Sequence, residues 1–154
     1  LQADASKISE MLLSEGYPPD WTSHNSTDII RLGLLTGNRL DATKVMMAMN
    51  TSYLNYTSLI PKLQTKYDVM VVFENATVEN ATGDLVDFGT APGQFCAIAN
   101  DSISNMYINK SITTGDCHNV IFTFSHKNMA LVKRLVVDNS SSSIIRMVVY
   151  TWQK

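Results

Sequence analysis

The chain has 154 residues, 45% hydrophobic and 17% charged, with a formal net charge of −2 at pH 7. This length suits a single domain over residues 1–154, and the apolar content excludes an intrinsically disordered chain. The longest uncharged stretch, residues 45–61, is interrupted by Asn, Ser and Thr, so it lacks the ~18 consecutive apolar residues of a transmembrane helix. With 12 basic and 14 acidic residues and no basic cluster, nothing indicates a nucleic-acid-binding surface.

A helix is predicted over residues 4–15, where apolar side chains recur at helical spacing on one face. Asp4 or Ser6 is a suitable N-cap for this helix. Gly16 ends it, because glycine and the two prolines that follow cannot continue a helix. The chain is therefore expected to open on a short amphipathic helix.

One strand and two short helices are predicted next. Residues 28–35 place alternate Ile and Leu side chains on one side, which indicates a strand, and a turn follows at 36–39. Asp41 is a good N-cap for a helix that carries Val, Met and Met at helical spacing. A second short helix is predicted around residues 59–64, with Pro61 tolerated only in its first turn.

Strand patterns dominate after residue 66. Residues 67–74 are almost continuously apolar, which predicts a strand covered on both faces, and residues 84–89 are expected to return as its hairpin partner. Residues 91–115 read as loop-rich, and residues 120–124 alternate as a further strand.

The last two predicted strands, residues 130–138 and 144–152, flank a polar turn and should form an antiparallel hairpin. One fully apolar face on the final strand indicates a central position in the sheet, where Met11 and Leu12 of the first helix are expected to pack. The residues of that face are Ile145, Met147 and Val149. Helices first and strands afterwards indicate an α+β fold, with the N-terminal helix and the short helices packed on an antiparallel β-sheet.

Asparagine-linked glycosylation sequons are in large excess. Eight of the 12 Asn residues begin an N-x-S/T triplet, whereas chance pairing with the 29 Ser and Thr residues would give about two. The predicted N-glycosylation sites are Asn25, Asn50, Asn55, Asn75, Asn80, Asn100, Asn109 and Asn139. Most of them fall where turns and loop tips are expected, and N-linked glycans would supply the surface polarity that the few charges do not. The alternative is a composition that is simply rich in Ser, Thr and Asn.

The two cysteines, Cys96 and Cys117, are the predicted disulfide. In an oxidising compartment such a pair should bridge and stabilise the fold by about 3 kcal/mol. The alternative is two reduced thiols buried as small apolar side chains. Together with the sequons, the pair favours an extracellular location.

No catalytic or metal-binding motif is found. Cys117 and His118 are adjacent, which does not match the spaced ligands of zinc sites, and all three histidines are expected in loops or at the surface: His24, His118 and His126. No G-x-S-x-G nucleophile elbow and no glycine-rich phosphate-binding loop occurs. We therefore expect no enzyme activity, no catalytic residues, no metal and no cofactor.

Four acidic residues bracket the predicted hairpin of residues 67–89: Glu74, Glu79, Asp84 and Asp87. They have the chemistry for a Ca²⁺ site or for the acid pair of a glycosidase. The alternative, which we favour, is a solvated hairpin tip that carries sequons.

Several sequence blocks resemble a group of archaeal secreted, membrane-anchored proteins related to type IV pilins. In chain order the blocks are LLSEGYPPDW at residues 12–21, RLGLL at 31–35, NRL at 38–40, KYD at 66–68 and IIRMVVYTW at 144–152. The resemblance covers most of the chain, is weakest over residues 78–120, and carries no catalytic residue. It implies an extracellular, glycosylated α+β head behind a hydrophobic stem helix.

In that group the stem lies directly before a block like residues 5–21, and residues 1–154 do not include it. We expect the native protein to carry an apolar helix continuous with residues 4–15 that anchors the head in a membrane. The functional interpretation is a structural, pilin-like subunit at the archaeal cell surface, and adhesion is a further role open to such a subunit. The expected partners are copies of the same protein in a filament or surface assembly. The alternative is a surface-displayed binding module or enzyme that acts on carbohydrate or peptide.

Overall fold

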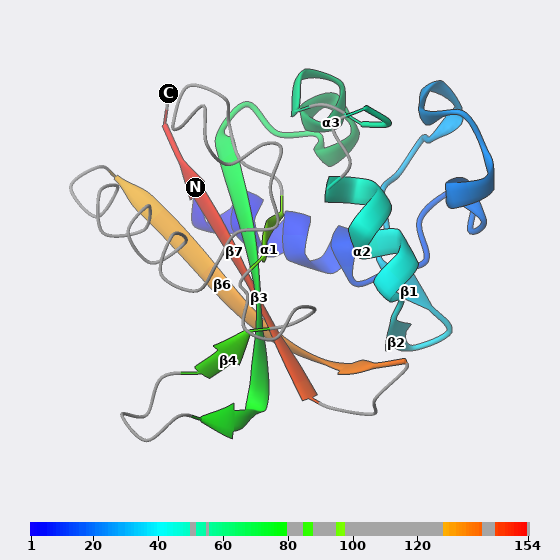
Figure 1. Cartoon of the computed structure of the whole chain (residues 1–154). Helices are drawn as coiled ribbons and strands as arrows, with labels where there is room; N and C mark the ends of the chain where they lie inside the picture. Colours follow the sequence, from blue (N-terminus) through cyan, green and yellow to red (C-terminus); the bar gives the residue numbers. More distant parts are fainter. Residues whose placement is uncertain are drawn as a thin grey trace.

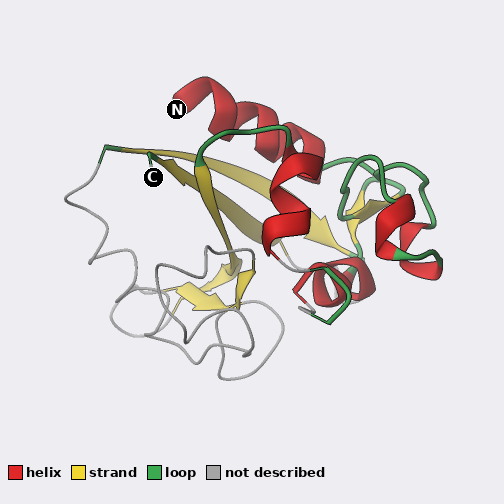
Figure 2. Ribbon diagram, turned by 90° about the horizontal axis from the view of Figure 1, so that it is seen from above, coloured by secondary structure: helices red, strands yellow, loops and turns green. Residues whose placement is uncertain are grey.

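The computed structural model describes residues 1–49, 52–54, 56–79, 85–87, 95–97, 128–139 and 144–153. Within these residues, helices and a β-sheet form an α+β fold, as predicted. Helix α1 (Gln2–Leu12) lies across one face of the sheet and contacts its two long C-terminal strands, and Figures 1 and 2 show this layering from two directions.

The sheet is built on three long strands: β3 (Asp68–Glu79), β6 (Met129–Asp138) and β7 (Ile144–Trp152). β6 and β7 form the predicted antiparallel hairpin, with Met129 opposite Trp152. β3 pairs antiparallel with the other edge of β7, so β7 is the central strand that its apolar face indicated.

Four short strands complete the sheet in the order β1-β2-β6-β7-β3-β4, with β5 also paired to β3. They are β1 (Leu35–Thr36), β2 (Arg39–Leu40), β4 (Leu85–Asp87) and β5 (Phe95–Ala97). β2 runs parallel to β6, with Leu40 opposite Asp138, so the sheet is mixed rather than wholly antiparallel. The two strands are far apart in the sequence, so no tight turn requires them to run antiparallel, and β2 pairs with the edge of β6 that β7 does not occupy.

Two further α-helices and two 3₁₀ turns lie between α1 and β3. They are η1 (Trp21–Ser23), η2 (Ser26–Asp28), α2 (Ala42–Met49) and α3 (Tyr56–Leu63). Asp41 caps α2 as predicted, because its Oδ1 accepts hydrogen bonds from the Thr43 and Lys44 N–H groups at 2.9 and 3.3 Å. Pro61 is the sixth residue of α3, so the expectation that it would fall in the first turn is wrong.

The predicted strand over residues 28–35 does not form. Only Leu35 at its end belongs to a strand, and Tyr17 and Arg31 make a single isolated bridge. Ile30 is 63% exposed, whereas Leu32 and Leu34 are buried, so the apparent alternation comes from a loop that turns two leucines inward.

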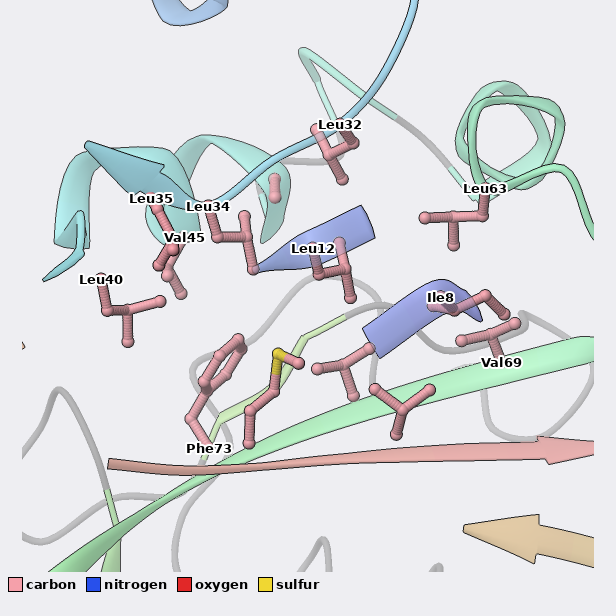
Figure 3. Packing of buried hydrophobic residues seen from close by; sticks show 14 of the residues in the cluster. Ile8, Leu12, Leu32, Leu34, Leu35, Leu40, Val45, Leu63, Val69 and Phe73 are labelled. Atoms are coloured by element: carbon pink, nitrogen blue, oxygen red, sulfur yellow. The ribbon is translucent and has the colours of Figure 1, made fainter. Parts of the chain in front are cut away.

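One apolar core joins the helices to a single face of the sheet. Ile8 and Leu12 of α1 point toward Val69 and Phe73 of β3, and the loop and hairpin leucines pack at the end of the helix (Figure 3). Ile145, Met147 and Val149 belong to this core, and Met11 packs against it while remaining partly exposed. The predicted packing of the first helix on the final strand is therefore confirmed. Met70, Val148 and Trp152 are also buried and alternate with the core positions, so β3 and β7 carry buried side chains on both faces.

Candidate functional site

The start of α1 lies against the C-terminal end of β7. The Leu1 carbonyl accepts the first helical hydrogen bond from the Ala5 N–H at 2.9 Å and a second from Thr151 Oγ1 at 3.1 Å. Leu1 occupies the N-cap position and no side chain caps the helix, so the expected caps at Asp4 or Ser6 are wrong. Figure 2 shows this end of the helix at the periphery of the molecule, beside the C-terminal end of the chain.

Polar contacts fix α1 on the sheet in addition to its apolar face. Arg134 of β6 donates from Nε to Ser9 Oγ at 3.1 Å and from Nη2 to Ser6 Oγ at 3.2 Å, and it lies 3.7 Å from a Glu10 carboxylate oxygen. Ser9 is fully buried and donates to the Ser6 carbonyl. Gln2 Nε2 donates to the Leu131 carbonyl at 3.3 Å on the outer edge of β6.

The opposite end of α1 leads into a tightly packed corner formed by residues 13–41. Gly16 has a φ of 81°, and a Cβ built on Gly33 would collide with the Gly16 nitrogen and the Ser14 carbonyl oxygen. Trp21 is fully buried and its Nε1 donates to the Gly33 carbonyl at 2.8 Å. The two backbone segments therefore cross at a distance that only glycine permits.

Within this corner, a buried lysine of α2 links the segment that follows α1 to the β1–β2 hairpin. Lys44 is 4% exposed, and its Nζ donates to the Glu15 and Leu35 carbonyls at 2.9 and 2.5 Å. Burial lowers the pKa of Lys44 from its usual 10.5, against the opposing attraction of nearby carboxylates. The carboxylates are Asp41, Glu15 and Asp20. Glu15 also accepts the Gly37 N–H at 2.9 Å, so the turn and the helix end are tied together.

Tyr53 closes the other side of the corner. Its ring stacks on Trp21 with centroids 6.3 Å apart, and its hydroxyl lies 2.9 Å from the Trp21 carbonyl oxygen and 2.8 Å from that of His24. Burial raises the pKa of Tyr53 above its usual 10.0, and the charge of Asp28 raises it further. The hydroxyl proton is thus held by two backbone acceptors.

The sequence-predicted glycosylation sites divide into three groups. Asn25 and Asn139 are exposed at turns, as expected. Asn75 does not lie at a loop tip: it sits within β3, paired with Ile145 of β7 on one side and Val86 of β4 on the other. β3 ends at Glu79, five residues beyond the predicted end of this strand at residue 74, so Asn75 falls inside the strand. The remaining sites, Asn50, Asn55, Asn80, Asn100 and Asn109, lie outside the described residues.

The structure describes only one of the two cysteines of the predicted disulfide. Cys96 lies in β5 opposite Val72 of β3, within a segment expected to be loop, and Cys117 lies outside the described residues. The bridge therefore stays a prediction. The expected strand at residues 120–124 also lies outside the described part of the chain.

The candidate chemical residues are not brought together into a reactive cluster within the described residues. His24 is partly exposed, with Nε2 3.1 Å from Asp20 Oδ1, while His118 and His126 lie outside the described part. Glu74 and Asp87 are cross-strand partners in the β3–β4 pair, and Asp84 is not described. Among residues whose side chains are described, no three His, Cys, Asp or Glu groups come close enough to hold a metal ion.

No pattern in the sequence indicates the contacts that Lys44 and Arg134 make in the fold. The cap at Asp41 was visible, but Lys44 reads as an exposed helical lysine until the Glu15 and Leu35 carbonyls are brought to it by the fold. Arg134 likewise reads as half of a basic pair with Lys133, and only the strand register turns it toward α1.

Comparison of the chain with protein families, with curated proteins and with solved structures finds no match. In the described part of the chain, no helix has both the length and the apolar character to cross a membrane.

Proposed function

We propose that this chain is the exposed head of an extracellular cell-surface protein, with a structural, pilin-like role rather than a catalytic one. The observation that carries the proposal is the position of α1: it packs along one face of the sheet, and its first turn lies at the periphery of the molecule. A helix start of this kind can continue into a longer helix without losing any contact that it makes to the sheet.

The anchoring of α1 also supports this role. A stem that carries load must transmit it to the head, and α1 is fixed both by its buried face and by the polar contacts of Arg134, Gln2 and Thr151. In the proposed assembly, apolar stems of neighbouring copies pack together, driven by burial of apolar surface. The excess of sequons and the cysteine pair support an extracellular location.

The proposal is tested by expressing the complete gene in its native host with a C-terminal tag and locating the product. Membrane fractions or filaments that contain the protein, degraded by protease added to intact cells, are the expected result. A freely secreted monomer, or a product that stays in the cytoplasm, would overturn it.

A substitution at the helix start tests whether α1 continues upstream. Proline is well tolerated at the first position of a helix but disrupts a helix interior by about 3 kcal/mol. Gln2→Pro should therefore reduce the assembled fraction of the complete protein if Gln2 lies inside a continuous helix. Gln2→Ala is the matched control, because it removes the same hydrogen bond to Leu131 and keeps the helix intact. Equal assembly of both variants would contradict the continuous stem.

A further inference from the structure

The sequon at residues 25–27 is the one whose three residues are all described in full. Asn25 is exposed at the turn between η1 and η2, with extended backbone angles of φ −69° and ψ 148°. It precedes η2 without making a capping hydrogen bond, and Thr27, which completes the sequon, is also exposed. Both the acceptor amide and the recognition hydroxyl are therefore on residues at the surface.

The fold fixes the position of this turn. The Asp28 N–H donates to the Asn25 carbonyl at 2.9 Å, and the Tyr53 hydroxyl lies 2.8 Å from the His24 carbonyl oxygen. The turn belongs to the corner at the far end of α1 from Leu1, as Figures 1 and 2 both show. A bulky group on Asn25 would stand away from the proposed stem and from the packed face of the sheet.

Asn75 begins a comparable sequon, Asn75-Ala76-Thr77, whose backbone lies within a strand rather than at a turn. All three residues lie in β3, and the backbone of Asn75 is paired with strands on both sides. An enzyme that must take the acceptor residue into its own site cannot do so without separating these strands. Asn139 is also exposed at a turn, and Ser141 of its sequon lies outside the described residues.

We infer that Asn25 accepts an N-linked oligosaccharide on the folded head, whereas Asn75 does not. The donor is an oligosaccharide carried on a lipid phosphate or diphosphate. The Asn25 amide nitrogen bonds to the anomeric carbon of the first sugar, the bond from that carbon to the phosphate oxygen breaks, and the lipid phosphate leaves with the electron pair. The amide loses one proton to a base of the transferase. As a biological modification this rests on the proposed extracellular location.

The test uses the unglycosylated folded 154-residue chain, a purified single-subunit oligosaccharyltransferase and its lipid-linked oligosaccharide. Glycopeptide mass spectrometry should find the sugar on Asn25 and none on Asn75. Synthetic peptides spanning each sequon serve as controls, and both should be modified, because the fold rather than the local sequence makes the difference. Asn38, which is exposed but outside any sequon, should stay unmodified.

Two variants at Thr27 test whether transfer to Asn25 requires an intact sequon. Thr27→Ala should abolish transfer to Asn25, and Thr27→Ser should retain it, since either hydroxyl residue completes the triplet. No transfer to Asn25 in the folded chain while its peptide is modified, or equal transfer to Asn25 and Asn75, would overturn the inference. These results do not depend on where the cell places the protein, so they are independent of a failure of the proposed function.

Discussion

At the scale of single residues, the corner is held by backbone contacts that leave no room at Gly33. A Cβ there would meet the Gly16 nitrogen and the Ser14 carbonyl, and would lie 2.6 Å from the Glu15 carbonyl carbon. Because all three atoms are backbone, Gly33→Ala should destabilise the protein by about 3 kcal/mol or more in urea unfolding.

Gly37→Ala is the control for this prediction. Gly37 has a φ of 62° and open space around the position of a Cβ, so alanine there pays only the left-handed backbone cost of about 1–2 kcal/mol. If Gly33→Ala proved no more destabilising than Gly37→Ala, the close crossing of the two segments would be wrong.

Tyr53 gives a pH-dependent prediction. Because burial and then Asp28 raise its pKa, the folded protein keeps the phenol proton at pH values where the unfolded chain has lost it. The contribution of this group to stability is therefore complete below pH 10.0 and is lost as the pH rises above that value. Tyr53→Phe should cost about 1 kcal/mol at neutral pH, and the difference from the wild type should shrink above pH 10.

The measurement is urea unfolding of both proteins across this pH range. Lys44 is present in both, and its lowered pKa acts in the opposite direction, with stability from that group rising toward pH 10.5, so the difference between the two proteins isolates Tyr53. Below pH 9 the difference should be constant. A difference that stays constant through the alkaline range would contradict the raised pKa of Tyr53.

At the scale of elements, β6 presents two neighbouring basic residues to opposite faces of the sheet. Arg134 reaches Ser9 and Ser6 of α1, whereas Lys133 is exposed. Arg134→Met keeps an apolar stem but removes the donors, and should cost about 1 kcal/mol of unfolding free energy. The Glu10 contact adds little, because that carboxylate is exposed.

Lys133→Met provides the matched control for Arg134→Met and should change stability by less than about 0.5 kcal/mol. Both changes are read from the midpoint of urea unfolding at constant slope. Equal effects of the two substitutions would show that the α1–β6 hydrogen bonds contribute nothing beyond general surface charge.

The elements that the sequence alone predicts correctly are those determined by residues close to one another in the chain. The β6–β7 hairpin follows from two apolar runs on either side of a polar turn, and the start of α2 follows from the Asp41 cap. The strand predicted over residues 28–35 is wrong because Leu32 and Leu34 are buried by a loop. That loop is held by Gly16 contacts, by the Tyr17–Arg31 bridge, and by a hydrogen bond from Lys62 Nζ to the Ile29 carbonyl at 2.6 Å. None of these partners is close in sequence, so alternation alone cannot distinguish this loop from a strand.

At the scale of the whole molecule, the same distinction applies to the candidate sites. The sequence identifies every sequon, but only the fold separates Asn25, in an exposed turn, from Asn75, paired on both sides within the sheet. The seating of α1 is partly predictable, since its apolar face is visible in the sequence. Its polar attachment through Arg134 and Thr151 depends on strand register, which no local pattern sets.

The last prediction concerns whether helices and sheet unfold together. The core is one cluster that runs from the corner, through α1, to β3 and β7, and small domains with one core unfold cooperatively. The two tryptophans report on different ends, because Trp21 lies in the corner and Trp152 in the sheet. In Trp152→Phe, fluorescence reports on the corner alone, and its urea midpoint should coincide with that of far-UV circular dichroism. An earlier fluorescence transition would mean that residues 13–41 form a separate unit, and the single domain predicted for residues 1–154 would then be wrong.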